Sequence, residues 1–309
     1  MNFLVIGAGA MGCLFAARLR LAGHPVVLVE KWAERREMIS KEGIRLEGVG
    51  GEYAVSVPVL SGTPLFPPDV ILIFVKSSET REAAEEAEPW VEPGTSVLTL
   101  QNGLGNVEIL AATFGKGRVL GGTTAEGATL LSHGRIRHAG RGKTCIAPAE
   151  GSPARAQEVA SAFIQAGFET EVGQDLNSLL WGKLIVNVGI NAVAAITHLK
   201  NGQLPRFHEL RLIMEEAVEE ASQVARAKGV ALPYADPLQR VLEVCSSTSN
   251  NVSSMLQDFL NRRPTEIDSI NGAVVREGKE LGIPTPVNLT LTSLVRVIQQ
   301  TYSSKSRED

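Results

Sequence analysis

Hydrophobic positions in the first part of the chain come in short, β-branched runs, and these runs alternate with stretches that carry apolar residues at helical spacing. This alternation is typical of strands that are joined by crossover helices in a parallel sheet. The runs that we interpret as strands are Phe3–Ile6, Val26–Val29, Val70–Val75, Val97–Leu100 and Val119–Gly121. The pattern predicts an α/β domain with a doubly wound parallel sheet over residues 1–173.

The hydrophobic pattern changes twice further along the chain. Between Ala125 and Ala147 helical periodicity is weak while Val, Ile, Thr and Gly stay frequent, which predicts a hairpin at the sheet edge with a turn near His133 and Gly134. After about Gly173 the periodicity becomes helical. The clearest helical stretches are Leu176–Ala195, Leu210–Lys228 and Ser254–Leu260. Residues 174–309 are therefore expected to form an all-helical domain.

Composition agrees with two packed domains and narrows the classes of function. The chain has 309 residues, of which 44% are hydrophobic and 21% charged, which is an ordinary globular balance. The net charge is −4 and the basic residues are scattered, so binding to nucleic acid is not expected. The three cysteines, Cys13, Cys145 and Cys245, stand far apart, a spacing that suits neither a disulfide framework nor a zinc site.

The ends and apolar runs of the sequence favour a cytoplasmic location. Met1 leads directly into the first strand without a basic leader, so a signal peptide is not expected. The run Val70–Val75 is far shorter than the roughly 20 residues that cross a bilayer, and no membrane span is expected. A reducing cytoplasm also suits three separate thiols.

A glycine-rich turn follows the first predicted strand. The segment Gly7-Ala8-Gly9-Ala10-Met11-Gly12 opens a predicted helix over Met11–Leu21. In such a turn one glycine makes the tight bend, one lets the backbone approach a pyrophosphate, and one lets helix and strand pack closely. A chance glycine-rich turn is the bland alternative. The strand before it, the helix after it, and an acidic Glu30 about 20 residues on favour a Rossmann-type dinucleotide site.

Residues around Glu30 bear on the choice of cofactor. A carboxylate at that position accepts hydrogen bonds from ribose hydroxyls and repels a 2′-phosphate, so it favours NAD. Lys31, Arg35 and Arg36 follow directly and could pair with that phosphate instead, although a solvated basic helix face is an equal alternative. The sequence leaves both cofactors open.

Two further strand ends carry polar residues where such a sheet places its ligand. Lys76 follows Val75, and Asn102 lies in Gln101-Asn102-Gly103. Lys76 is a candidate for the cofactor site, and Asn102 is a candidate bridge between nicotinamide and substrate. An Asn-Gly pair is by default only a turn.

A polar stripe in the helical half suggests where the chemistry lies. Lys183, Asn187 and Asn191 have the spacing i, i+4, i+8 and share one face of an otherwise apolar helix. They form either a structural hydrogen-bond ladder or a surface that faces substrate in the cleft between domains. Reduction of a ketone leaves negative charge on its oxygen, and Lys183 can supply a proton there.

A second cluster has a serious structural alternative. Ser254 and Gln257 have the spacing of a helix capping box. Glu266 follows Pro264 and falls where acids stabilise the first turn of a helix. Spacing alone therefore favours structural roles for Ser254 and Glu266.

Taken together, these motifs resemble the ketopantoate reductase family (2-dehydropantoate 2-reductases) over nearly the whole chain. The most specific match is Ser253-Ser254-Met255-Leu256-Gln257-Asp258 together with Thr265-Glu266-Ile267-Asp268 and Asn271-Gly272. The resemblance implies reduction of 2-dehydropantoate to (R)-pantoate with NADPH, in pantothenate and coenzyme A biosynthesis. It also implies a cytoplasmic enzyme that is commonly a homodimer.

The resemblance also implies roles for individual residues. Lys183 is the expected general acid, and Glu266 is expected to orient the lysine and the substrate. Asn187, Asn191 and Ser254 are expected to bind substrate. The nicotinamide end is expected to be lined by Lys76 and Asn102, while residues 7–12 and Glu30 with Lys31 hold the rest of the cofactor.

Two departures from the family pattern leave alternatives. Glu30 stands where NADPH-using members offer a basic residue nearby, and Ala192–Thr197 replaces a Leu-Thr sequence after Asn191. A related 2-oxo acid or opine-type dehydrogenase has the same architecture, because fold does not fix substrate. A dinucleotide-sensing regulator without chemistry is the alternative from another class, and it has no need of a proton donor such as Lys183.

Overall fold

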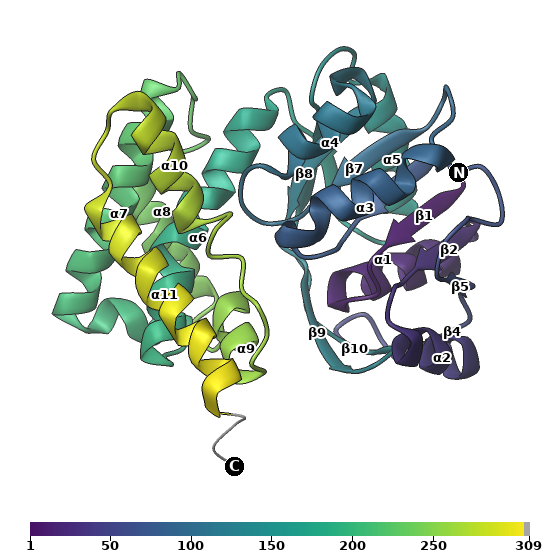
Figure 1. Cartoon of the computed structure of the whole chain (residues 1–309), viewed down its shortest axis with the longest axis horizontal. Coiled ribbons are helices and arrows are strands. Elements are labelled where there is room, and N and C mark those ends of the chain that lie inside the picture. Colours follow the sequence, from purple (N-terminus) through teal and green to yellow (C-terminus); the bar gives the residue numbers. More distant parts are fainter. Residues whose placement is uncertain (306–309) are drawn as a thin grey trace. The chain divides into compact units, whose positions relative to one another are not determined.

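The computed structural model describes residues 1–305 (Figure 1). It divides into two compact units. The first comprises residues 1–101 and 106–176, and the second comprises residues 102–105 and 177–309, of which 306–309 lie outside the described residues. The predicted boundary between 173 and 174 differs from this division in one important respect. The short segment 102–105 groups with the helical unit, although it is embedded in the sequence of the first.

The first unit contains an eight-stranded sheet in the order β12-β11-β8-β7-β6-β1-β2-β5. Its strands are β1 (Phe3–Ile6), β2 (Val26–Val29), β5 (Val59–Leu60), β6 (Val70–Ile73), β7 (Ser96–Thr99), β8 (Val119–Thr124), β11 (Thr144–Pro148) and β12 (Thr170–Val172). All neighbouring pairs are parallel except β8 with β11. The doubly wound α/β fold class predicted from the hydrophobic pattern is confirmed.

Strand order changes direction beside β1. From β1 the chain moves to β2 on one side, whereas β6, β7 and β8 follow on the other side. Right-handed crossovers then place the helices of the two halves on opposite faces of the sheet. The helices of the unit are α1 (Ala10–Leu21), α2 (Ala33–Glu42), α3 (Thr80–Ala87), α4 (Asn106–Phe114) and α5 (Ala154–Gln165). A ligand crevice is expected at the carboxyl ends of β1 and β6, where the order reverses.

The predicted hairpin has its turn in the right place but belongs to a different sheet. Strands β9 (Gly127–Ser132) and β10 (Arg135–Gly140) pair antiparallel around His133 and Gly134. They join β3 (Ile44–Gly48) and β4 (Tyr53–Val55) in a separate four-stranded sheet, in the order β4-β3-β10-β9. Strands β3 and β4 were not predicted, because they are short and carry polar residues. The second sheet packs against α1.

The second unit is helical in all of its described regular structure, as predicted. Its helices are α6 (Leu176–Thr197), α7 (His208–Ala227), α8 (Pro237–Ser247), α9 (Ser254–Leu260), α10 (Asn271–Leu281) and α11 (Pro286–Lys305), with a 3₁₀ segment at Asn201–Arg206. Helix α6 contains Gly189. At Gly189 an added Cβ would lie 2.9 Å from side-chain atoms of both Val218 and Val241, so this glycine permits close packing on α7 and α8.

Helix α6 is also long and apolar enough to cross a membrane, and it is the one such helix within residues 1–305. Of its most apolar 18-residue window, 72% is buried inside the protein. Burial of this kind is typical of a core helix, so length and composition alone carry little weight here.

Candidate active site

The glycine turn lies at the carboxyl end of β1, and each of its three glycines meets a different surrounding. Gly7 has φ of +100°, and an added Cβ would lie 2.9 Å from the Val75 backbone nitrogen. At Gly12 an added Cβ would lie only 1.9 Å from the Gly7 carbonyl oxygen, so helix and turn are in direct contact. At Gly9 it would meet no atom within 4 Å. These are the three surroundings that a pyrophosphate-binding turn requires.

The start of α1 completes an anion-binding arrangement. Gly9 is the residue before the helix and provides no side-chain cap, and the first turn contains no acidic residue. Amides at a helix N-terminus attract negative charge, and the open side of Gly9 leaves room for it. The turn therefore fits the pyrophosphate of a dinucleotide. Lys76, which follows β6, is half-buried and lies next to the Val75 backbone that touches Gly7.

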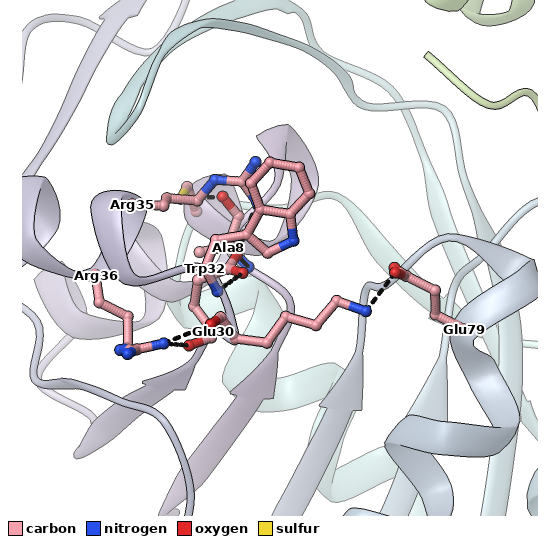
Figure 2. A network of polar contacts seen from close by, with 8 residues as sticks. Ala8, Glu30, Trp32, Arg35, Arg36 and Glu79 are labelled. Carbon is pink, nitrogen blue, oxygen red and sulfur yellow. Dashed lines mark hydrogen bonds and ion pairs between the residues drawn. The ribbon is translucent and has the colours of Figure 1, made fainter. Parts of the chain in front are cut away.

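Glu30 is buried and already occupied by donors from the protein (Figure 2). Only 4% of its surface is exposed. One carboxylate oxygen, Oε2, accepts from the Ala8 backbone at 3.1 Å and from Arg35 Nη1 at 2.7 Å. The other, Oε1, accepts from the Trp32 backbone at 3.0 Å. Glu30 thus ties the glycine turn to α2, and Arg35 neutralises its charge.

The other cations of this cluster also have partners. Lys31 Nζ lies 2.5 Å from Glu79 Oε1 (Figure 2). It also lies 3.6 Å from Glu82 Oε2. Arg36 donates to the backbone carbonyls of Glu30 and Lys31 at 2.8 and 2.6 Å. A solvated basic helix face does not describe this arrangement, because Lys31 and Arg35 are ion-paired and Arg36 is hydrogen-bonded to backbone carbonyls.

The polar stripe lies on α6, as its spacing predicts. Lys183 and Asn187 are half-buried, and Asn191 is buried. Burial lowers the pKa of the Lys183 ammonium from 10.5 to about 8, and the negative charge of Glu266 acts in the opposite direction. An amine with this pKa is a competent proton donor near neutral pH.

Glu266 does not lie in the first turn of a helix, so the structural role considered for it is wrong. Residues 266–270 form a turn, and α10 begins only at Asn271. The Glu266 carboxylate instead accepts a hydrogen bond from Asn102 Nδ2 at 3.1 Å. The second unit thereby brings together three of the predicted residues, Lys183, Glu266 and Asn102.

The helix cap predicted at Ser254 lies one residue earlier. Ser253 precedes α9, and its hydroxyl accepts from the Leu256 backbone at 3.2 Å. Gln257 does not complete a capping box, since its amide donates to the Val252 carbonyl. Ser254 is the first residue of the helix and is exposed. Its hydroxyl is therefore not required as the cap.

The cysteines take no part in this arrangement. All three are buried and free. Burial raises the pKa of the Cys13 thiol to about 12, with Arg35 acting to lower it and Glu30 to raise it. A thiol of this pKa is protonated at neutral pH and a poor nucleophile. Among residues 1–305 no group of three His, Cys, Asp or Glu side chains is arranged to hold a metal ion.

Comparison with known proteins identifies the chain's relatives. A family model described as "Ketopantoate reductase PanE/ApbA" matches residues 3–151, and one described as "Ketopantoate reductase PanE/ApbA C terminal" matches residues 175–299. The 2-dehydropantoate 2-reductase of Halobacterium salinarum is 36% identical over 303 residues, which cover 97% of this chain and 99% of that protein. That of Archaeoglobus fulgidus is 35% identical, with 96% and 97% covered.

Solved structures also match over nearly the whole chain. A PanE/ApbA family ketopantoate reductase from Ralstonia eutropha JMP134 matches with a TM-score of 0.90 and 34% identity, covering 97% of this chain and 99% of that one. A D-mandelate dehydrogenase bound to NADH and anilino(oxo)acetate matches with a TM-score of 0.91 and 26% identity, at the same coverage.

Fold and site together define an oxidoreductase that uses a nicotinamide dinucleotide. The chain belongs to the ketopantoate reductase family. The family resemblance inferred from the motifs is confirmed.

Proposed function

We propose that this protein is a 2-dehydropantoate 2-reductase, which reduces ketopantoate to (R)-pantoate on the route to pantothenate and coenzyme A. The observation that carries the proposal is a half-buried lysine, Lys183, with a pKa of about 8, in the same unit as a Glu266–Asn102 pair. Full-length similarity to reductases of this name supports the choice of substrate. A sensor that binds dinucleotide without chemistry is not favoured.

Lys183 acts as the general acid. When bound, the nicotinamide supplies a hydride to the ketone carbon, and the ketone oxygen then needs a proton. The Lys183 ammonium donates that proton and stabilises the negative charge as it develops. Glu266 orients the amine and, through its charge, keeps the pKa of Lys183 from falling further. Asn187, Asn191 and Ser254 bind the carboxylate and hydroxyl of the substrate.

The two predicted domains divide these tasks. Residues 1–173 serve as the dinucleotide-binding domain, in which residues 7–12 hold the pyrophosphate while Lys76 lines the nicotinamide end. Residues 174–309 serve as the substrate and catalytic domain. Asn102, which groups with the helical unit, contacts both cofactor and substrate.

NADPH is the proposed cofactor, in spite of Glu30. A carboxylate selects NAD by accepting from ribose hydroxyls and by repelling a 2′-phosphate. Here Oε2 of Glu30 already accepts two protein hydrogen bonds, and Arg35 offsets its charge at 2.7 Å. Arg36, which within residues 1–305 is hydrogen-bonded only to backbone carbonyls, then supplies a cationic group for the phosphate, and Lys31 and Arg35 add positive charge beside it.

A matched cofactor and substrate assay tests the proposal. Initial rates are measured on ketopantoate with NADPH and with NADH, and then on pyruvate and 2-oxoisovalerate. We expect the highest kcat/KM with ketopantoate and NADPH. Comparable turnover of the other 2-oxo acids would argue instead for a related 2-oxo acid dehydrogenase. The structural similarity to a D-mandelate dehydrogenase is the observation that favours this second candidate. A higher kcat/KM with NADH than with NADPH would indicate that the Glu30 carboxylate binds the ribose hydroxyls of NAD.

Location and assembly complete the proposal. The family resemblance favours a cytoplasmic homodimer. Light scattering coupled to size-exclusion chromatography tests the assembly, since a dimer has twice the 33.0 kDa of the chain. A single species of monomer mass at assay concentration would contradict the dimer.

A further inference from the structure

Four residues embedded in the sequence of the first unit pack within the helical unit. We call residues 102–105 the strap. Its Leu104 amide donates to the Ser269 carbonyl at 2.8 Å, and Asn102 donates to Glu266 at 3.1 Å. Gly103 has φ of +85°, and an added Cβ would lie 2.3 Å from the Ser269 carbonyl oxygen. The strap is therefore held against the turn that carries Glu266.

The residues on either side of the strap belong to the first unit, and both are hydrogen-bonded to the same hydroxyl there. Thr80 Oγ1 accepts from Gln101 Nε2 at 2.9 Å and donates to Asn106 Oδ1 at 2.8 Å. Gln101 precedes the strap directly, and Asn106 follows it directly. A single side chain thus connects both ends of a four-residue loop.

This anchor is built into the core of the first unit. Thr80 has no exposed surface, and Asn106 is 4% exposed. Gln101 makes further hydrogen bonds, since its Nε2 donates to the Val75 carbonyl at 2.7 Å and its Oε1 accepts from Thr99 at 2.8 Å. Removal of the Thr80 hydroxyl would deprive two amide side chains of a partner at once, which is costly where water has little access.

We propose that Thr80 is a positioning residue for the reduction: it clamps both ends of the strap and so sets where Asn102 meets Glu266. Thr80 contacts neither Lys183 nor Glu266 in any described hydrogen bond, and it acts through the strap. The inference rests on the proposed function, because it assigns a mechanistic consequence to the position of Glu266.

The consequence should be visible in the pH profile. Glu266 is the charged group that acts on the pKa of Lys183, and it raises that pKa against the effect of burial. If the strap loosens, the field of Glu266 at Lys183 weakens, and the pKa of the amine falls. Lys183 then loses its proton at a lower pH, and the rate of reduction declines at a lower pH as well. A role confined to folding would leave this pH dependence in place.

The experiment compares Thr80→Val, which removes the hydroxyl and keeps the shape, with Thr80→Ser, which keeps the hydroxyl. We expect Thr80→Val to lower kcat about tenfold. The decline of kcat/KM at alkaline pH, which we call the alkaline limb, should begin at a pH about half a unit lower. NADPH affinity should stay within about twofold of the unmodified protein. Thr80→Ser should restore both the rate and the limb.

Thr95→Val is the matched control. Thr95 is also buried in the first unit, and its hydroxyl likewise donates one hydrogen bond and accepts another, to Pro68 and from Glu92. It has no contact with the strap in these bonds. We expect Thr95→Val to lower the melting temperature and to leave the alkaline limb unchanged.

The outcomes separate this inference from the proposed function. An unmodified protein that fails to reduce ketopantoate overturns the proposed function. An active protein in which Thr80→Val leaves kcat and the alkaline limb unchanged, or lowers only the melting temperature, overturns the role of Thr80. If Thr80→Val does not fold, Gln101→Met removes one of the two bonds to the hydroxyl, together with the side-chain bonds of Gln101 to Val75 and Thr99. A limb that does not move in that variant overturns the inference too.

Discussion

The glycine turn of the first unit and the lysine cluster of the second are built in opposite ways. The turn is one continuous stretch, residues 7–12, and it works through backbone groups and through the absence of side chains. The lysine cluster joins α6, the strap and the turn before α10, and its Asn102–Glu266 hydrogen bond connects residues 164 positions apart. The first arrangement leaves space for a bound anion, and the second adjusts the pKa of a proton donor.

This difference determines how each region should respond to change. A site that is formed by backbone groups tolerates few added side-chain atoms, because they collide with neighbouring atoms and destabilise the fold. A site made of buried charges tolerates changes of shape better than changes of charge, because pKa values depend on every neighbouring group. Substitutions can therefore test whether the two regions really differ.

The largest effect is expected at Lys183. Lys183→Ala removes the proton donor, and we expect kcat to fall by roughly 100-fold or more while dinucleotide binding persists. Steady-state rates and a fluorescence titration with NADPH measure the two quantities. Lys279→Ala, at an exposed lysine on α10, is the control and should keep its rate. Near-normal turnover of Lys183→Ala would remove the lysine from the mechanism.

The same substitution at two glycines should give opposite results. Gly9→Ala adds a methyl group where no protein atom lies within 4 Å, so the fold should keep its stability while NADPH affinity falls about tenfold. Gly12→Ala places the methyl group 1.9 Å from the Gly7 carbonyl, and we expect about 3 kcal/mol of destabilisation.

Thermal unfolding and cofactor titration of both glycine variants make this comparison. If Gly9→Ala binds NADPH normally, the open side of that glycine does not face the cofactor. If Gly12→Ala keeps its melting temperature, the close contact between turn and helix does not limit the stability of the fold.

The rate should depend on pH through Lys183. The amine must carry its proton to act as an acid, and burial brings its pKa down to about 8. We therefore expect kcat/KM to fall as pH rises above about 8, approaching a tenfold loss per pH unit. Glu266→Gln should shift this decline to lower pH by about half a unit, because the carboxylate raises the pKa of the lysine. A decline that begins near pH 10 would contradict the burial of the amine.

The smallest effect is expected at Arg35. Arg35→Ala exposes the charge of Glu30 and frees one acceptor site on its Oε2, so the preference for NADPH over NADH should fall about fivefold. Arg45→Ala, at an exposed arginine of the second sheet, serves as the control. An unchanged ratio of the two kcat/KM values would show that Arg35 serves the fold alone.

Much of the fold could be predicted from the sequence because its signals are local. Strands β1 and β2 begin and end at the predicted residues, and α9 spans the predicted 254–260. The second sheet could not be predicted, because β3 and β10 pair across about 90 intervening residues and neither has a strong pattern of its own. The predicted edge hairpin was assigned to the wrong sheet for the same reason.

The candidate site shows the same limit. The sequence contained Glu30 and Arg35 as separate candidates with opposed effects on cofactor choice. In the structure the two residues form an ion pair, so Arg35 offsets the charge of Glu30. This pairing depends on how α2 follows β2. Thr80 carried no signal at all, since a lone threonine at the start of a helix is ordinary. Its importance depends on two amides that lie 21 and 26 residues further along the chain.

The sequence by itself determined the alternation of strands and helices in the main sheet, the change to a helical second half, the glycine turn and the spacing of the polar stripe, because periodicity and backbone freedom act over a few residues. Only the tertiary structure decided that the strap packs with the helical unit, that Glu266 lies in a turn and meets Asn102, and that Glu30 is neutralised. Those outcomes depend on burial and on electric fields, and both arise only when distant segments of the chain come together.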